Sequence, residues 1–380
     1  MQSIVSKPSE DPSANVNMSA TYTTHPCMLI CPRRIESQRT FVIELRATEP
    51  AVIVEDPLLV WAMLALPSKF TEAEAKAIWA QEEKAEDVVD EVWEFALGEG
   101  LLLSSEKAAA FNTRLDIWKE IGWEDAGIYH EGTKDYPFVA MNHKDAFLDD
   151  NARMKEYEDE WMAPNVYQIF ETRENVDLIK VESGLESRVL DRSVKAPLKD
   201  LSLFFDFCFG ERFRLDHAYD EQNFLQLESL RKSIPSGGGR HPTEAFLLCL
   251  NENLGVSKGL YHYDVKNNRL EMLKAGDFHS EAEKLARTKI EDASAILFLS
   301  SLCERAMWRY RDPRSWRAFV IDVGHLEYMC TQVGASVDYT LKFTHQFDSI
   351  AAAQFLKTDP FRQPLMSVAA LSLKGAAKNV

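Results

Sequence analysis

The sequence predicts an α+β fold, and three stretches of its C-terminal half carry that prediction. A glycine-rich loop at residues 235–244 leads into the apolar run 245–250, which has the pattern of a buried strand or of the core face of a helix. Residues 259–273 have the pattern of a hairpin, in which an aromatic strand and a second strand flank a turn with two asparagines. The run 293–301 is short and apolar, as expected of a fully buried central strand.

The overall composition is that of a globular protein with an acidic surface. The chain has 380 residues, which by ordinary domain sizes suggests two domains or three. Hydrophobic residues make up 46% and charged residues 27%, enough for a sizeable core and a soluble surface. The net charge of −17 argues against a general nucleic-acid binder, although a local basic patch can still hold a phosphate.

The N-terminal segment and the cysteines indicate a cytoplasmic protein. Residues 1–24 are polar and lack the apolar core of a secretion signal, so we expect a disordered tail there. Cys27 and Cys31 lie close together, but no second pair of ligands completes a zinc site, and we expect no metal. Scattered cysteines fit a reducing cytosol, and no apolar run reaches the length that crosses a membrane.

Residues 25–110 predict a winged-helix-like domain. A capping box formed by Thr71 and Glu74 opens one of its helices. DNA binding is disfavoured, because the expected recognition helix at 87–95 is rich in Asp and Glu rather than Arg and Lys. A structural or dimerising cap is an open alternative. The expected elements are strands at 28–30, 40–45 and 51–54, helices at 57–66, 71–79 and 86–97, and a strand at 101–104.

The remaining chain divides into a connecting region and a second large domain. Residues 111–184 are rich in aromatic side chains and include a charged segment at 149–160, which is either a solvated face or a flap over a cleft. We expect the second domain to span 185–380. Its further elements are a helix near 197–205, an amphipathic helix at 276–287, a long helix at 326–333 and a final strand at 365–373.

The glycine-rich loop is the candidate binding element. Gly237, Gly238 and Gly239 allow positive φ and a close approach of the backbone to a bound group. Ser236 offers a hydroxyl and Arg240 a fixed cation, and both suit an anionic or polar ligand. A surface turn is the alternative interpretation of the loop alone.

The loop and hairpin together resemble a known family. The order Pro-Ser-Gly-Gly-Gly-Arg-His-Pro-Thr-Glu, then Gly-Leu-Tyr-His-Tyr-Asp and a Leu-Glu-x-Leu strand, is similar to the SagB-type dehydrogenases of the FMN-dependent nitroreductase-like superfamily. The likeness covers approximately the C-terminal half. It implies a nitroreductase-like domain with a mixed sheet flanked by helices, and a homodimer with FMN at the subunit interface. It also implies action on ribosomally made peptides, in many members the oxidation of azolines to azoles.

The resemblance assigns further cofactor-binding residues. The family's phosphate-binding Arg-Arg-Ser-x-Arg motif is degraded here, leaving Arg188 and Arg192, for which surface charges are the alternative. Arg317 opens a segment similar to the family's Arg-Ala-Tyr-Arg…Asp-x-Gly-His, read as a strand that joins the long helix. Lys374, near the end of the chain, is a further candidate cation for the phosphate.

The resemblance also points to a catalytic pair, with one departure. Tyr310 falls on the family's tyrosine, but Arg309 stands where azoline-oxidising members carry lysine. A lysine can lose its proton and act as a base, whereas arginine effectively cannot. Either Tyr310 takes the proton, or the flavin reaction differs; without the family context the pair is equally an interfacial stack.

The family context sets the expected partners and the alternatives. A winged-helix-like module in peptide-modifying enzymes often adds the precursor's leader as a strand to its sheet edge, and residues 25–110 are similar in layout. We therefore expect a precursor peptide, a second copy of the chain, and a cyclodehydratase or other maturation proteins as partners. The alternatives are a peptide dehydroamino-acid reductase or other flavin reductase, a non-catalytic docking subunit, and a transcription regulator.

Overall fold

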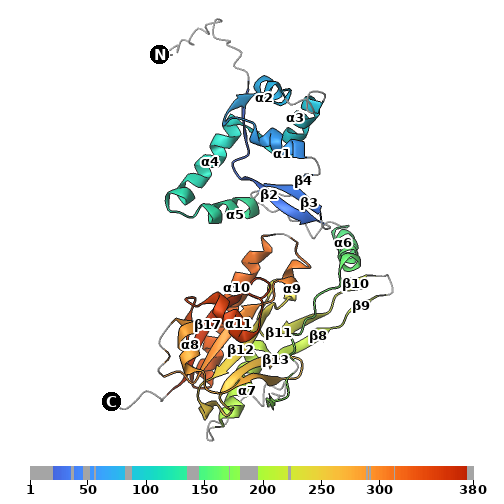
Figure 1. Ribbon diagram of the computed structural model, residues 1–380. Helices are drawn as coiled ribbons and strands as arrows, with labels where there is room; N and C mark the ends of the chain where they lie inside the picture. Colours follow the sequence, from blue (N-terminus) through green and yellow to red (C-terminus); the bar gives the residue numbers. More distant parts are fainter. Residues whose placement is uncertain are drawn as a thin grey trace, which may run out of the picture. The chain divides into compact units, whose positions relative to one another are not determined.

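A computed structural model describes residues 20–35, 38–45, 52–54, 57–81, 88–134, 145–170, 172–179, 196–220, 224–287, 290, 292–311 and 313–374. The chain forms two compact units, 1–138 and 139–380, and each has its own sheets and core. Figure 1 shows the strands β2–β4 and helices α1–α5 of the first unit, and the large sheet with its covering helices in the second.

The described residues of the first unit form two small antiparallel sheets and five α-helices. One sheet has the strand order β5-β1-β6 and the other β2-β3-β4. The elements are β1 (Thr21–Thr24), β2 (Met28–Ile35), β3 (Gln38–Leu45), β4 (Val52–Val54), α1 (Pro57–Leu64), β5 (Phe70–Thr71), α2 (Glu72–Trp79), α3 (Val89–Gly98), β6 (Leu102–Ser104), α4 (Ser105–Glu120) and α5 (Glu124–Lys134).

Local sequence signals explain the start of α2 and the core beneath it. The predicted capping box is present, because the Thr71 hydroxyl accepts from the backbone of Glu74 and the Glu74 carboxylate accepts from the backbone of Thr71. Trp79 and Trp93 are buried and close the core between α2 and α3, with ring centroids 6.3 Å apart. The predicted helix–helix–helix–strand order is interrupted only by the two-residue strand β5.

The expected disordered tail over 1–24 needs a correction at its end. Thr21–Thr24 forms β1, the central strand of its sheet, and pairs with β5 on one side and β6 on the other. The backbone of these four residues is satisfied by two neighbours, which outweighs their polar composition. Residues 1–19 lie outside the described residues. The assignment of a winged helix stays a prediction from the element order.

The second unit is built on a seven-stranded sheet with the order β16-β17-β15-β12-β13-β14-β7. Its strands are β7 (Asn175–Asp177), β12 (Thr243–Cys249), β13 (Gly259–Asp264), β14 (Arg269–Ala275), β15 (Ala295–Ser301), β16 (Tyr339–Thr344) and β17 (Leu365–Leu373). The expected hairpin is β13–β14, and the expected central and final strands are β15 and β17. Residues 245–250 lie mainly in β12 and therefore form a strand and not a helix face.

The expectation of a mixed sheet is wrong for the described residues. All the described pairings in the seven-stranded sheet are antiparallel, including those between strands far apart in sequence, such as β12 with β15 and β15 with β17. The pairs β12–β13, β13–β14 and β16–β17 are consecutive along the chain and joined at the same end of the sheet, so in each pair the two strands run in opposite directions.

Helices cover both faces of this sheet, as expected for an α+β fold. One core contains α7 (Pro197–Phe209) and α10 (Ser315–Ser336), and the other contains α8 (His279–Ala286) and α11 (Ser349–Leu356). The other elements are α6 (Ala146–Glu160), β8 (Glu211–Leu215), β9 (Ala218–Tyr219), β10 (Leu225–Gln226), β11 (Ser229–Lys232), η3 (Gly237–Gly239), η4 (Glu252–Leu254) and α9 (Glu304–Met307). No helix among the described residues is both long and apolar enough to cross a membrane.

The long helix begins eleven residues earlier than the sequence suggested. The segment from Arg317 was read as a strand that joins a helix at 326–333, but the whole stretch Ser315–Ser336 is α10. The buried residues Phe319, Val323, Leu326 and Cys330 recur every three or four positions, which is the helical period. The short apolar run 318–321 obscured that period, because a run of four cannot distinguish the two structures.

Candidate functional site

The glycine-rich loop is fastened to α10 by one carboxylate. The Ser236 hydroxyl donates to Asp322 Oδ2 at 2.6 Å, and the Gly237 amide donates to Asp322 Oδ1 at 3.1 Å. Ser236 also accepts from the His241 amide at 2.9 Å, so its oxygen closes the loop from inside. Burial raises the pKa of Asp322, while the bonds from Ser236 and Gly237 act in the opposite direction. In this arrangement Ser236 shapes the loop; its contact with a cofactor stays a prediction.

Two glycines of the loop occupy space that no other residue could. Gly238 and Gly239 have φ of 60° and 64°, in the left-handed region. A Cβ on Gly238 would lie 2.0 Å from the Tyr310 hydroxyl oxygen, and one on Gly239 would lie 2.1 Å from Arg231 Nη1. The missing side chains therefore let a tyrosine and an arginine approach the loop backbone directly.

The predicted catalytic pair lies beside this loop. The guanidinium of Arg309 lies over the Tyr310 ring, 4.9 Å from its centroid. Arg309 Nη2 also contacts both carboxylate oxygens of Asp150 on α6, at 2.6 and 2.8 Å. The charged helix α6 thus supplies the counter-charge of Arg309, and the structure brings Gly238, Tyr310 and Arg309 together.

Arg240 adds a second cation to the same group. Its Nε donates to the Gly238 carbonyl at 3.1 Å, and its side chain is half-buried. Burial lowers the pKa of the Arg240 guanidinium, and the charges of Arg309 and Arg231 lower it further. Arg231, Arg240 and Arg309 outnumber the two carboxylates described at the loop, Asp150 and Asp322, which leaves a net positive charge suited to an anionic ligand.

A cavity of about 300 Å³ opens next to the loop. Gly239 and Arg240 line it from the loop, and Arg305 and Trp308 line it from α9 and its C-terminal end. Its remaining lining residues come from α6, from the segment that follows α6, and from the β8–β11 region: Glu158, Met162, Ala163, Pro164, Asn165, Val166, His217, Leu227, Glu228 and Ser229.

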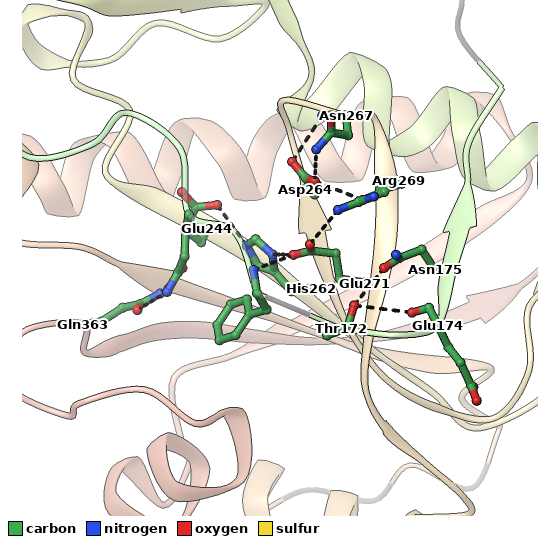
Figure 2. A network of polar contacts seen from close by, with 12 residues as sticks. Thr172, Glu174, Asn175, Glu244, His262, Asp264, Asn267, Arg269, Glu271 and Gln363 are labelled. Carbon is green, nitrogen blue, oxygen red and sulfur yellow. Dashed lines mark hydrogen bonds and ion pairs between the residues drawn. The ribbon is translucent and has the colours of Figure 1, made fainter.

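Sequence reasoning missed a buried charged network that extends from this cavity into the sheet. Figure 2 shows His262 between two glutamates: its Nδ1 is 3.1 Å from Glu271 Oε2 and its Nε2 is 3.3 Å from Glu244 Oε2. Glu244 also pairs with Arg305, which is 4% exposed. The strand register places Glu244, His262 and Glu271 together. His262 of β13 pairs with Glu271 of β14 and with Phe246 of β12, and Glu244 lies two residues before Phe246, on the same face of β12.

The charges of this network shift one another's pKa values. Burial alone raises the pKa of Glu244, but Arg305, His262 and Lys232 outweigh it and lower that pKa to about 2. Burial alone lowers the pKa of His262, but the two glutamates outweigh it, so that pKa is raised. The pKa of Glu271 is lowered, because its bonds from His262 and from the Phe170 amide exceed the effect of burial. The two carboxylates therefore favour the imidazolium form of His262.

Two groups near the loop have pKa values that burial and neighbouring cations depress. Burial lowers the pKa of Lys232 to about 8, with Arg305 adding to the effect and Glu244 opposing it. Burial and the charges of Lys232, Arg231, Arg305 and Arg240 lower the pKa of His241 to about 3. His241 is thus neutral and also has a positive φ of 44°, which is a strained backbone conformation for a histidine.

The other predicted site residues lie apart from this group or outside the described residues. Arg317 is half-buried on α10, next to Ala318, whose Cβ faces Gly237. Lys374 donates to the Ala335 carbonyl, near the far end of α10. Thirteen positions separate Ala335 from Asp322, about 20 Å along a helix, so this chain does not bring Lys374 to its own loop. Arg188 and Arg192 lie outside the described residues.

The described residues hold no group of three or more His, Cys, Asp or Glu side chains that could bind a metal ion. The six cysteines are free thiols.

Comparison with known proteins gives relatives over part of the chain. No family model matches it. It is 34% identical over 148 residues to the trifolitoxin-processing protein TfxB of Rhizobium leguminosarum bv. trifolii, covering 37% of this chain and 39% of that protein. It is 24% identical over 240 residues to the trifolitoxin operon protein TfxC of the same organism, covering 60% and 66%. The chain thus spans less than two thirds of the length of these relatives.

Solved structures show a partial likeness in fold. A provisionally assigned nitroreductase from Anabaena variabilis has 19% identity and a TM-score of 0.45, over 59% of this chain and 45% of that one. The E. coli microcin synthetase McbBCD complex with truncated pro-MccB17 bound has 16% identity and a TM-score of 0.38, over 71% and 97%. The chain is an α+β protein by its own sheets and helices, and its sequence is similar to a trifolitoxin-processing protein and a trifolitoxin operon protein.

Proposed function

We propose that this chain is an FMN-dependent oxidoreductase that acts on a ribosomally synthesised peptide, as a dehydrogenase of the azoline-to-azole type. The observation that carries the proposal is the grouping of the glycine loop, Arg240 and Tyr310 beside a cavity of about 300 Å³. The sequence similarity to a trifolitoxin-processing protein supports a peptide as substrate.

The residues at the cavity fit a flavin. Its oxygen-rich pyrimidine edge and its phosphate both accept hydrogen bonds, and the cavity wall offers the cations Arg240 and Arg305 and glycine backbone that can be approached closely. When bound, FMN supplies two-electron chemistry as hydride transfer. Small-molecule sites measure about 300–1,000 Å³, so one copy of the chain provides room at the low end of that range.

Within this site, Tyr310 is the residue that we assign to proton transfer. Its hydroxyl lies against the loop, whereas Arg309 has the side chain of an arginine, which is unsuited to act as a base, and is held by Asp150. Tyr310 then moves the proton at its phenolic oxygen, and Arg309 stabilises the negative charge of a phenolate through its place over the ring. This division replaces the lysine–tyrosine pair expected from the resemblance.

A second copy of the chain is the proposed source of the rest of the site. One face of α10 carries Trp316, Val320 and Tyr328, which are 42%, 54% and 68% exposed, and Gly324 lies between them on the same face. Large apolar side chains repeated along one helix face favour burial against another protein surface. Asp322 holds the glycine loop on the opposite side of α10, so dimerisation through the exposed face would bring a partner to the helix that supports the cofactor-binding residues.

The first unit is the proposed leader-binding module. Its sheet β2-β3-β4 has two outer strands, and an extended peptide can join such an edge through backbone hydrogen bonds. A cyclodehydratase or other maturation protein would act on the peptide before an oxidation of this kind, because an azoline must be formed before it is oxidised. A transcription regulator is disfavoured, because α3 carries Asp90, Glu91 and Glu94 and no Arg or Lys.

The experiment that tests the proposal has two steps. Purified protein should show a flavin absorbance band or gain one on addition of FMN. A peptide rich in Cys, Ser or Thr, co-expressed with a cyclodehydratase that forms its azolines, should then lose about two further mass units, since desaturation transfers a hydride to the cofactor. A gain of about two mass units would instead support a dehydroamino-acid reductase, which uses the same cofactor in reverse. Protein that is colourless and does not bind FMN would instead support a non-catalytic docking subunit. The ion pair between Arg309 and Asp150 is consistent with that alternative.

A further inference from the structure

One buried donor of Arg305 has no hydrogen-bond partner among the described residues. Arg305 is 4% exposed, and its Nε donates to the Asn165 carbonyl at 3.0 Å. Its Nη1 donates to the His241 carbonyl at 3.2 Å and to Glu244. Its Nη2 is buried and is the donor without a partner in the part of the chain that the structure describes. A buried charged donor left without a partner is more costly than a neutral one, so such an atom indicates a missing ligand or water.

The position of Arg305 favours a ligand. Its side chain lines the cavity of about 300 Å³ together with Arg240 and Gly239 of the glycine loop. A ligand that fills this cavity can therefore approach both the loop and the Arg305 side chain. The two cations on one wall select a group that carries negative charge or strong acceptor oxygens.

The network behind Arg305 keeps it positive towards the cavity. Its carboxylate partner Glu244 is shared with the imidazolium of His262, so one negative charge serves two cations. His262 is held on its other side by Glu271, which also accepts from Arg269 Nη2 at 3.2 Å and from the Phe170 amide at 2.9 Å. Strands β12, β13 and β14 fix Glu244, His262 and Glu271, whereas Arg305 itself lies on the short helix α9.

We propose that Arg305 is a ligand-binding residue of the cavity, whose Nη2 donates to an anionic oxygen of the flavin, and that Glu244, His262 and Glu271 position its guanidinium. The identity of the ligand rests on the proposed function. The oxygen belongs either to the pyrimidine edge of the ring or to the phosphate, which are both strong acceptors. His262 and Glu271 are positioning residues, since they act on the ligand through Glu244 and Arg305.

The test compares Arg305→Met with wild type in binding FMN, riboflavin and inorganic phosphate. Arg362→Met is the matched control, because Arg362 is an exposed arginine that pairs with Glu304 of α9 and does not line the cavity. We expect R305M to weaken FMN binding by about 10- to 100-fold, the range for losing a hydrogen bond to a charged group, and R362M to leave it unchanged. Binding is measured by flavin fluorescence for FMN and riboflavin and by calorimetry for phosphate.

The outcomes separate the two oxygens and the two proposals. An equal loss of FMN and riboflavin binding supports the ring edge, and a loss of FMN binding alone supports the phosphate. Folded R305M that binds FMN, riboflavin and phosphate as wild type does overturns the inference. If wild type binds no flavin, the proposed function fails, and phosphate binding then tests the role of Arg305 by itself. Phosphate binding that is present in wild type and lost in R305M supports a ligand-binding role for Arg305. A wild type that binds no phosphate overturns that role.

Two further variants protect the test against misfolding and probe the positioning. If R305M does not fold, Arg305→Lys keeps the charge but loses the planar fork, and we expect FMN binding several-fold weaker; unchanged binding contradicts the inference. His262→Gln should weaken FMN binding in wild type and have little further effect in an Arg305→Lys background. If the two substitutions weaken FMN binding by independent amounts in this double-mutant cycle, His262 does not act through Arg305.

Discussion

Arg305 and Arg309 lie four residues apart, yet the structure holds them in opposite ways. Arg305 and its partner Glu244 each have 3% of the side chain exposed, and the partner comes from the central strand β12. Arg309 and its partner Asp150 have 19% and 23% exposed, and the partner comes from the surface helix α6. A buried pair cannot lose one member without leaving a charge in a medium of low dielectric, whereas water can replace a partner at the surface. The pair of Arg305 and Glu244 therefore holds the site in one arrangement, whereas the pair of Arg309 and Asp150 can be broken at a small cost in stability.

The largest expected effect comes from a substitution in the buried network around Glu244. His262→Gln leaves Glu244 and Glu271 without the cation between them, and we expect a loss of about 3–5 kcal/mol in the free energy of unfolding, typical of breaking a buried ion pair. Urea unfolding at pH 6, with hydrogen exchange of the β12–β14 amides as a local readout, measures it. The control Glu160→Gln breaks an exposed pair with Arg311 and should cost less than 1 kcal/mol. Equal effects of the two substitutions would show that the buried network is not special.

The next-largest expected effect concerns the glycine-rich loop. Gly238→Ala places a Cβ against the Tyr310 hydroxyl and keeps a positive φ, so we expect a loss of about 1–3 kcal/mol and a displaced tyrosine. Gly98→Ala is the matched control. Gly98 ends helix α3 with open space around its Cβ position, so the change should be neutral or stabilising by up to about 1 kcal/mol. Thermal unfolding compares the two, and a Gly238→Ala variant as stable as its control would contradict the observed packing of Tyr310.

The pH dependence of stability tests the buried network further. Each unit of difference between the folded and unfolded pKa of a group changes the free energy of unfolding by about 1.4 kcal/mol. The raised pKa of His262 gives stability that is complete below its unfolded value of 6.5 and is lost as the pH rises through the folded value. The lowered pKa of Glu244 gives stability that is present above 4.5 and is lost as the pH falls towards 2. The network should therefore stabilise most between pH 4.5 and 6.5.

This window is measured as the difference in unfolding free energy between wild type and His262→Gln across pH 3–9. The difference is needed because the lowered pKa of His241 makes both proteins less stable as the pH falls from 6.5 towards 3, and that contribution cancels. A difference that grows above pH 7 would show that His262 is neutral in the folded protein.

The smallest expected effect is on the exposed side. Asp150→Asn removes the counter-charge of Arg309, and we expect a loss of about 0.2–1 kcal/mol, because both side chains keep contact with water. Urea unfolding under the same conditions measures it. A cost as large as that of His262→Gln would mean that α6 is an essential part of the site rather than a replaceable cover.

The sequence allowed the elements to be predicted better than their contacts. The hairpin β13–β14, the central strand β15 and the capping box at Thr71 follow from local patterns of alternation, turn residues and side-chain caps. The same local patterns failed for α10, where a short apolar run concealed the helical period, and for β1, whose polar strand is defined by its neighbours.

The candidate site was predictable only in part. The glycine loop, Tyr310 and Arg309 could be found because they lie in or near a recognisable stretch of sequence. The network of Glu244, His262 and Glu271 was missed, because its members come from three strands and meet only through the register of the sheet. A titratable residue within each of three strand-like runs was the available signal, and it gains meaning only once the strands are paired.

That register has a consequence for how the length of the chain can vary. His262 pairs with Glu271 across the turn that joins β13 and β14, and inserting or deleting a single residue between either of them and the turn would turn one of these side chains to the opposite face of the sheet. The irregularity in register between Leu260 and Tyr261 lies on the other side of the pair and leaves it intact. Between the pair and the turn, length changes among homologues should accordingly come in pairs of residues, and a homologue with one extra residue there should lack the histidine as well.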